Sequence, residues 1–279
     1  MVFWTLCGLV ALVWFFVYTA TPSGHVKVAI LNVGQGDSIY IESPTGQQVV
    51  IDGGPDSSLL RELPKVMPWF DHSLDMVVAT HPDSDHIVGF VDLLSRYHIG
   101  AFMEPGVLKN TQTNQKLEKE VLDEHIVHYI ARRGMMLTLG GGAVLRVLSP
   151  DTDVSHLNPN RDNDAGIVLQ LVFGSTTALF MADIEHPVED KLIVLDGAWL
   201  KSDVLKVGHH GSRTASEDAF IGLVHPQFAA ISVAAHNTYR LPNQEPIDTL
   251  KKYGAEVLRT DEVGTVVFES DGKKFWLVK

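Results

Sequence analysis

The stretch from residue 80 to residue 86, Thr-His-Pro-Asp-Ser-Asp-His, holds chemically active side chains at high density. Two imidazoles and two carboxylates lie within six positions, those of His81, Asp83, Asp85 and His86. Nitrogen and oxygen ligands of these kinds bind zinc, manganese or iron. The stretch directly follows the apolar run 76–79, which is typical of a buried strand. The sequence therefore predicts a metal-binding loop at the end of a strand.

Three further groups of such side chains also follow apolar, strand-like runs. They are Asp52 with two glycines behind it, Asp183, and the adjacent pair His209 and His210. Each group has a simpler explanation when taken alone: a turn, the N-cap of the helix that follows Pro187, or two surface histidines. Four strands that all end in ligand-type residues are nevertheless what a site built from loops at one edge of a packed sheet requires.

Strand-like and helix-like stretches alternate along most of the chain, which predicts an α/β fold. Strands are expected at residues 26–33, 38–41, 48–52, 76–80, 144–148, 167–173, 177–181, 204–207, 229–233, 257–258, 265–268 and 275–278. Helices are expected at residues 60–67, 87–97 and 115–134. No long linker interrupts residues 26–279, so we expect them to form one domain.

Composition narrows the classes of function. The chain has 279 residues, of which 45% are hydrophobic, and this is ample for a core. Its formal net charge of −12 argues against a protein that coats nucleic acid electrostatically. Its single cysteine, Cys7, excludes an intrachain disulfide.

The first 20 residues carry no charged side chain. As a helix they would span about 30 Å, the thickness of a bilayer core. We therefore expect a transmembrane anchor at residues 1–20 and a linker at residues 21–25. A cleaved signal peptide and a buried helix are the alternatives, but no Lys or Arg precedes Lys27, whereas a signal peptide normally begins with a basic region. The flanks carry too few basic residues to predict on which side of the membrane the soluble part lies.

The order of these motifs resembles the metallo-β-lactamase superfamily. The usual His-x-His-x-Asp-His motif of that superfamily appears here with Asp83 in place of the second histidine. Together with the upstream string Asn-Val-Gly-Gln-Gly-Asp-Ser at residues 32–38 and His-His-Gly-Ser at residues 209–212, this is similar to the soluble domain of ComEC competence proteins. The resemblance covers residues 26–279. It implies a four-layer αβ/βα sandwich and a bacterial inner or cytoplasmic membrane as the location.

The resemblance also implies two divalent metal ions, with Zn or Mn expected, and a role for each site residue. His81 and Asp83 resemble ligands of one ion, and Asp85 and His86 those of the other. Asp183 resembles a bridging carboxylate, and His209 is preferred to His210 as the last ligand. Asn163 or Asp164 takes the place of a histidine of the wider superfamily, and Asp52 resembles the residue that orients the metal loop without binding metal.

Several positions depart from the pattern of the branch. The chain has Asn-Asp-Ala-Gly at residues 163–166 where Asn-Asn-x-Ser is usual, and Ala182 where glycine is usual. Leu241 stands where a histidine is usual near the end of the chain. These changes leave the metal ligands intact and affect residues expected to contact substrate.

The chemistry that such a site implies is hydrolysis of a phosphodiester. Two ions lower the pKa of a shared water and bind the anionic oxygens of the substrate. Asp85 and His210 are the expected catalytic residues, and the residues expected to contact substrate are His210, Ser212, Arg213 and Asn237. We expect a nuclease that acts on single-stranded DNA during uptake, with a separate channel chain as a possible partner. A membrane-tethered hydrolase of a small phosphodiester or ester, and a non-catalytic uptake component, are the alternatives.

Overall fold

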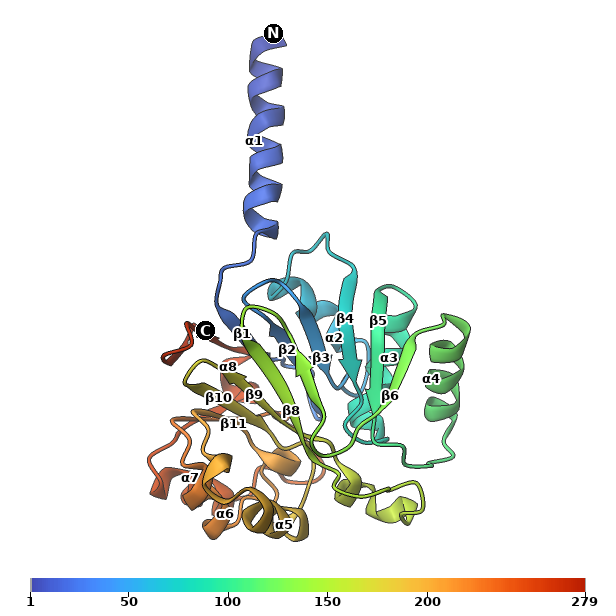
Figure 1. The fold of residues 1–279 in the computed structure, drawn as a ribbon, viewed down its shortest axis with the longest axis vertical. Coiled ribbons are helices and arrows are strands. Elements are labelled where there is room, and N and C mark those ends of the chain that lie inside the picture. Colours follow the sequence, from blue (N-terminus) through green and yellow to red (C-terminus); the bar gives the residue numbers. More distant parts are fainter. Residues whose placement is uncertain (1, 279) are drawn as a thin grey trace.

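A computed structural model describes residues 2–278, except for the side chains of residues 16–20 and 159–160. Helix α1 (Val2–Ala20) projects away from the body of the protein (Figure 1). Among the described residues, no helix has both the length and the apolar character needed to cross a membrane. The predicted transmembrane anchor at residues 1–20 is therefore not supported. Residue 1 and the side chains of residues 16–20, on which it partly depends, lie outside the described residues.

Two mixed sheets form the body of the protein. The first has the order β15 (Phe275–Leu277), β14 (Val266–Ser270), β1 (Val26–Ile30), β2 (Ile39–Glu42), β3 (Gln48–Ile51), β4 (Ser73–Val78), β5 (His98–Glu104), β6 (Val127–Ile130). The second has the order β13 (Glu256–Arg259), β12 (Phe228–Ile231), β11 (Val204–Lys206), β10 (Thr176–Phe180), β9 (Val168–Phe173), β8 (Ala143–Ser149), β7 (Met136–Thr138). Strands β3 to β6 are parallel, as are β10 to β13.

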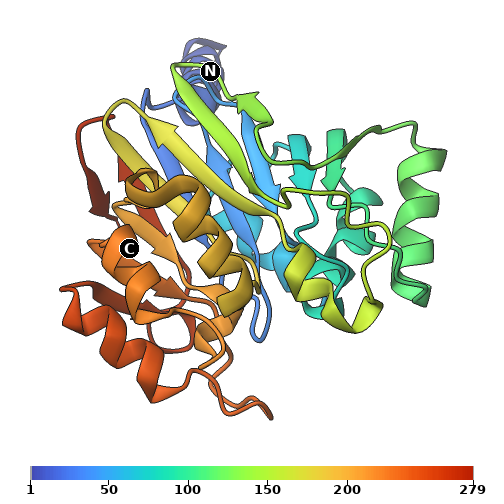
Figure 2. The same ribbon diagram turned by 60° about the horizontal axis from the view of Figure 1, so that its bottom comes forward.

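Helices cover the outer face of each sheet (Figures 1 and 2). The first sheet carries α2 (Ser58–Glu62), α3 (Ser84–Leu94) and α4 (Gln112–Asp123). The second carries α5 (His186–Asp196), α6 (Asp218–Val224) and α7 (Gln244–Lys252). The short elements are η1 (Leu63–Lys65), η2 (Pro159–Ala165), η3 (Gly197–Leu200), η4 (Gly208–Gly211) and α8 (Thr260–Val263).

The alternation of side chains along each strand explains why the layers form. In β1, Val28 and Ile30 face the core between the two sheets, whereas Ala29 faces the helices. Phe90 of α3 is fully buried in a second core, which lies between the first sheet and its helices. Burying such a side chain stabilises the fold by roughly 1.5–3 kcal/mol. The predicted four-layer αβ/βα sandwich is confirmed.

One predicted helix is wrong in its second half. The helix expected at residues 115–134 ends at Asp123, and the chain then forms strand β6 parallel to β5. His125 has φ 54°, a left-handed conformation that no helix continues. The following residues, Val-His-Tyr-Ile, are β-branched or aromatic types that favour a strand.

Candidate metal centre

The ends of four strands bring the predicted site residues to one edge of the sandwich. Residues 81–86 follow β4 and open α3, so the backbone turns from the sheet into a helix at the motif. Asp52 follows the neighbouring parallel strand β3. From the other sheet, Asp183 follows β10, and the histidine pair lies in η4 after the parallel strand β11.

Four side chains converge closely enough to hold one cation. The ligand atoms of Asp85, His86, Asp183 and His210 lie within 4.8 Å of one another. Asp183 Oδ2 is 3.3 Å from His86 Nε2 and 3.2 Å from His210 Nε2, and Asp85 Oδ2 is 3.5 Å from His210 Nε2. Two imidazoles and two carboxylates at these separations form a donor set that suits a divalent transition-metal ion.

The opposite nitrogen of each imidazole is held by the protein. His86 Nδ1 lies 2.8 Å from Asp52 Oδ2, and His210 Nδ1 lies 2.9 Å from the carbonyl oxygen of Ser232. Both partners are acceptors, so each Nδ1 carries the proton and each Nε2 faces the cluster. This arrangement fixes tautomer and ring orientation, as the hydrogen-bonding partners of metal-bound histidines do.

Asp52 organises the metal loop in a second way. Its carboxylate also accepts a hydrogen bond from the backbone nitrogen of Thr80 at 2.8 Å and one from the Thr80 hydroxyl at 2.7 Å. Because that hydroxyl donates to Asp52, it can accept from His81 Nδ1, 3.0 Å away. The Nε2 atom of His81 is thereby left as an acceptor. Asp52 is thus placed to hold the loop and contacts the cluster only through His86.

Unpaired buried atoms provide the test of fit. Among the described residues, Nε2 of His81, His86 and His210 and Oδ1 of Asp183 are buried with no hydrogen-bond partner. A buried polar atom without a partner costs roughly 1–3 kcal/mol, so four at one site call for an explanation. A cation at this position would satisfy those in the cluster, and the residues present therefore fit a metal ion.

Charge balance in the metal-free protein supports this interpretation. Burial lowers the pKa of His86, but the carboxylates of Asp183 and Asp52 outweigh burial and raise this pKa well above the usual range. Burial also lowers the pKa of His210, but the carboxylates of Asp183 and Asp37 outweigh it and raise this pKa well above the usual range. Burial raises the pKa of Asp183, but the two imidazoles outweigh it and lower that pKa well below its usual range. The protein thus assembles a site that attracts positive charge.

The comparison with protein families decides the family. The model of the metallo-β-lactamase superfamily matches residues 31–236. The chain belongs to the metallo-β-lactamase superfamily. The resemblance inferred from the motifs is confirmed.

Two curated relatives are similar to this chain over most of its length. The chain is 28% identical over 276 residues to ComE operon protein 3 of Bacillus subtilis and 26% identical over 249 residues to Competence protein ComA of Neisseria gonorrhoeae. The alignments cover 91% and 89% of this chain but only 34% and 33% of the relatives. The chain therefore spans about a third of the length of the relatives it matches.

Solved structures show the same fold. The metallo-β-lactamase fold protein YhfI from Bacillus subtilis matches with a TM-score of 0.60 and 15% identity, over 88% of this chain and 100% of that one. Igni18, a metallo hydrolase from Ignicoccus hospitalis, matches with a TM-score of 0.54 and 14% identity, over 88% of this chain and 99% of that one. At these identities the likeness establishes the superfamily fold alone.

The structure brings His210, and not the preferred His209, into the four-residue cluster. His209 Nδ1 lies 3.2 Å from Glu185 Oε1 and 3.2 Å from the Thr214 hydroxyl, away from the cluster. The pair does not lie on a strand: His209 and His210 have φ values of 46° and 53°, both left-handed. These two turns place His210, which is buried, against Asp183.

His81 and Asp83, which were predicted to bind the other of two ions, lie outside the four-residue cluster. Asp83 Oδ2 is 3.7 Å from His81 Nε2, but Asp83 Oδ1 forms an ion pair with Lys109. Asn163 Oδ1 is buried with no hydrogen-bond partner among the described residues. Asp164 forms an ion pair with Arg161, whereas Asn163 Oδ1 has no such partner in the described part of the chain, so Asn163 is the better candidate of the two.

The residues predicted to contact substrate differ in how far their side chains are used by the protein itself. Arg213 is exposed, and the buried Ser212 hydroxyl lies 3.0 Å from that of Thr214. Asn237 uses its whole amide inside its own loop: it donates to the carbonyl oxygens of Ala234 and Leu241 and accepts from Leu241 N. Each polar atom of the Asn237 side chain thus has a partner in this loop, and its contact with substrate stays a prediction.

The sequence analysis missed Asp37, which supports His210 from behind. Asp37 Oδ1 is 3.4 Å from His210 Nδ1, and the other oxygen pairs with Lys206. Both members of that pair are almost fully buried. Burial raises the pKa of Asp37, but the Lys206 ammonium and His210 outweigh it and lower the pKa to about 2. The signal in the sequence was the Gly-Gln-Gly-Asp string itself: a Cβ on Gly36 would lie 2.1 Å from the carbonyl oxygen of Asp85, so only glycine allows this approach.

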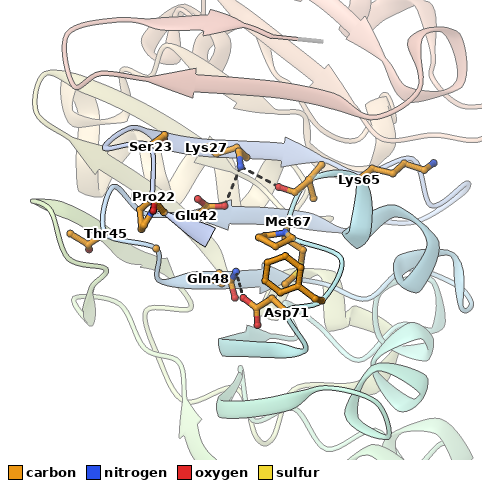
Figure 3. A pocket seen from close by; sticks show the side chains of 14 residues that line it. Pro22, Ser23, Lys27, Glu42, Thr45, Gln48, Lys65, Met67 and Asp71 are labelled. Atoms are coloured by element: carbon orange, nitrogen blue, oxygen red, sulfur yellow. Dashed lines mark hydrogen bonds and ion pairs between the residues drawn. The ribbon is translucent and has the colours of Figure 1, made fainter. Parts of the chain in front are cut away.

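A cavity of about 690 Å³ lies away from the centre, near the linker to α1 (Figure 3). Its charged and polar groups pair with one another. Lys27 Nζ is 3.1 Å from Glu42 Oε2 and 3.2 Å from the carbonyl oxygen of Val66, and the Gln48 amide donates to Asp71 at 3.0 Å. The cavity therefore shows no free set of ligands comparable to that of the metal centre.

Proposed function

We propose that this chain is a metal-dependent hydrolase whose cation is held by Asp85, His86, Asp183 and His210. The observation that carries the proposal is the convergence of these four side chains, with both Nε2 atoms facing the Asp183 carboxylate and both Nδ1 atoms hydrogen-bonded from behind. Membership of the metallo-β-lactamase superfamily supports it. The finer identity of the ion, Zn or Mn, stays a prediction.

The roles of the protein groups follow from their exposure. When bound, the cation supplies Lewis acidity, which activates a water and stabilises anionic oxygens. Asp85 is the most exposed of the four ligands, with a third of its side chain open to solvent, so it is placed to accept a proton from a water at the rim. His210 was predicted to be catalytic, but both its nitrogens are engaged, one with Ser232 and one with the cluster, and we assign it as a ligand.

The substrate class that we propose is a phosphodiester, and specifically DNA during its uptake. The names of the curated relatives support a link to competence, and phosphodiester cleavage matches an arrangement in which carboxylates and imidazoles present a cation to anionic oxygens. Arg213, which is exposed and follows the histidine pair in the sequence, is placed to attract the phosphate backbone of a DNA strand.

The test uses the purified full-length chain with fluorescently labelled single-stranded DNA and either Mn²⁺ or Zn²⁺. The expected result is cleavage that disappears in Asp183→Asn, which removes one ligand charge, and persists in His209→Ala, which removes a neighbouring imidazole outside the cluster. Equal cleavage by wild type and Asp183→Asn would reveal a contaminating nuclease and contradict the proposal. Absence of cleavage with either metal would exclude DNA as the substrate.

A second candidate substrate is a small phosphodiester or ester. The net charge of −12 favours it, and so does the burial of Lys206 in an ion pair with Asp37, which keeps that ammonium from contacting a DNA backbone. Hydrolysis of bis(p-nitrophenyl) phosphate that single-stranded DNA fails to inhibit would favour this candidate over the nuclease.

The predicted location at a bacterial inner or cytoplasmic membrane and the predicted separate channel chain stay proposals. Sedimentation of the full-length chain with bacterial membranes, and its release on deletion of residues 1–20, would support the location. The third alternative, a non-catalytic uptake component, would be favoured by a chain that binds DNA and metal but cleaves no phosphodiester.

A further inference from the structure

Lys109 places a positive charge beside the metal centre. It lies in the loop between β5 and α4, and its ammonium forms ion pairs with both Asp83 Oδ1 and Asp162 Oδ2. The two carboxylates come from distant parts of the chain, one from the start of α3 and one from η2. One lysine thus joins two separate acidic segments at the side of the cluster where the superfamily pattern implied a second metal ion.

The contact determines what Asp83 does. Asp83 is the N-cap residue of α3, a position at which an aspartate normally accepts hydrogen bonds from the first backbone N–H groups. Its side chain makes no such bond. One oxygen is taken by Lys109, and the other is 3.7 Å from His81 Nε2. Asp83 therefore contacts Lys109 and does not cap the helix with its side chain.

The atoms around Lys109 would suit a cation in its absence. Asp83 and Asp162 would each present a carboxylate oxygen. His81 Nε2 and Asn163 Oδ1 are buried without a hydrogen-bond partner among the described residues, and Asn163 is adjacent in the chain to Asp162. Carboxylates and imidazoles are ligands that manganese or zinc accepts. The ammonium therefore contacts two carboxylates, one of them 3.7 Å from His81 Nε2, that could otherwise bind a metal.

We propose that the Lys109 ammonium takes the place of a second metal ion, so that this chain binds one divalent ion tightly, at Asp85, His86, Asp183 and His210. The expectation of two ions is revised accordingly. Lys109 is a positioning residue for Asp83 and a fixed positive charge in the half of the centre that faces His81. The inference rests on the proposed metal centre, but it concerns the number of ions and not the reaction.

The experiment counts ions bound to the full-length chain. The protein is loaded with Mn²⁺, freed of excess ion by gel filtration and analysed by elemental mass spectrometry, with electron paramagnetic resonance as a second readout. Wild type is compared with Lys109→Met, which keeps most of the unbranched apolar stem of the side chain and removes its charge. Lys119→Met is the matched control, because Lys119 pairs with Asp123 on the exposed face of α4.

We expect one ion per chain for wild type and for Lys119→Met, with the spectrum of isolated Mn²⁺. We expect two ions for Lys109→Met, with the altered spectrum of a spin-coupled pair. Should Lys109→Met fail to fold, the pair Lys109→Arg and Lys109→Gln replaces it: one ion is expected for the arginine variant, which keeps the charge, and two for the glutamine variant.

The outcomes separate this inference from the proposed function. Two tightly bound ions in wild type would overturn the inference and leave the hydrolase proposal standing. One ion in both wild type and the charge-removing variants would also overturn it, because Lys109 would then not set the number. No ion in any variant would overturn the proposed metal centre itself.

Discussion

The metal centre and the cavity in Figure 3 are both rich in charged and polar groups, but those groups are used in opposite ways. In the cavity, Lys27 contacts Glu42 and a backbone carbonyl, and Gln48 contacts Asp71. In the centre, His86, His210 and Asp183 each keep a buried atom without a hydrogen-bond partner. The cavity is large, whereas the centre contains buried ligand atoms without a hydrogen-bond partner among the described residues.

This difference shows which observation indicates function. Volume measures where a molecule could fit, whereas unpaired buried polar atoms measure where the folded protein lacks a partner. Hydrogen bonds that the Nδ1 atoms of His86 and His210 donate to Asp52 and to the carbonyl oxygen of Ser232 orient the two Nε2 atoms toward the cluster. We expect changes at the centre to alter metal binding strongly and changes at the cavity to alter only stability, and weakly.

The largest effect is expected at His210. His210→Ala removes a cluster ligand and should weaken Mn²⁺ or Zn²⁺ binding by more than about 100-fold, because even the outer partners of metal ligands typically contribute 10–100-fold. Isothermal titration calorimetry measures the affinity. His209→Ala is the matched control and should change it little, since His209 faces Glu185 and Thr214. If the two variants exchanged these results, the assignment of the last ligand would be reversed.

Asp52 should have the next largest effect. Asp52→Asn keeps the shape of the side chain but removes the charge that holds His86 and Thr80. We expect metal affinity to fall by roughly 10–100-fold while the number of bound ions stays the same. Metal titration followed by circular dichroism would check both affinity and folding. An unchanged affinity would show that Asp52 does not orient the ligand.

Acidity should weaken metal binding by a smaller step. The raised pKa values of His86 and His210 mean that both imidazoles hold protons in the metal-free protein near neutral pH, and a cation must displace them. Affinity should therefore rise with pH, by about tenfold per pH unit for each proton released. Calorimetry in buffers of different ionisation enthalpy counts those protons. A pH-independent affinity between about pH 6 and 8 would contradict the proton count.

The smallest effect is expected in the cavity. Lys27→Met breaks the ion pair with Glu42, in which both side chains remain partly exposed. We expect a loss of about 1 kcal/mol or less in the free energy of unfolding, because solvent screens such pairs. Urea denaturation gives the stability change, and metal affinity should equal that of wild type. A large loss of metal affinity in this variant would erase the distinction between the two regions.

The positions of the chemically active residues were predictable because of where strands end. Asp52, His81 and Asp183 each follow an apolar run, and such runs form buried strands whose ends meet at one edge of the sandwich. The same pattern predicted most strands and the layers that they form. It failed at residues 127–130, where the alternation was taken for the end of a helix.

What stayed beyond sequence reasoning depended on backbone conformation and on distant contacts. The choice between His209 and His210 is made by two successive left-handed residues, which no spacing rule indicates. Lys109 lies 26 positions from Asp83 and 53 from Asp162, so nothing local in the sequence links it to either carboxylate. The burial of Lys206 likewise depends on Asp37, which lies in the other sheet's first loop.

Anomalous X-ray diffraction from crystals of the full-length chain grown with Mn²⁺ or Zn²⁺, recorded at the metal absorption edge, tests the central claim most directly. The account predicts a strong peak within bonding distance of His86 Nε2, His210 Nε2 and the carboxylates of Asp85 and Asp183. A peak beside His209, or no peak near these four residues, would contradict it.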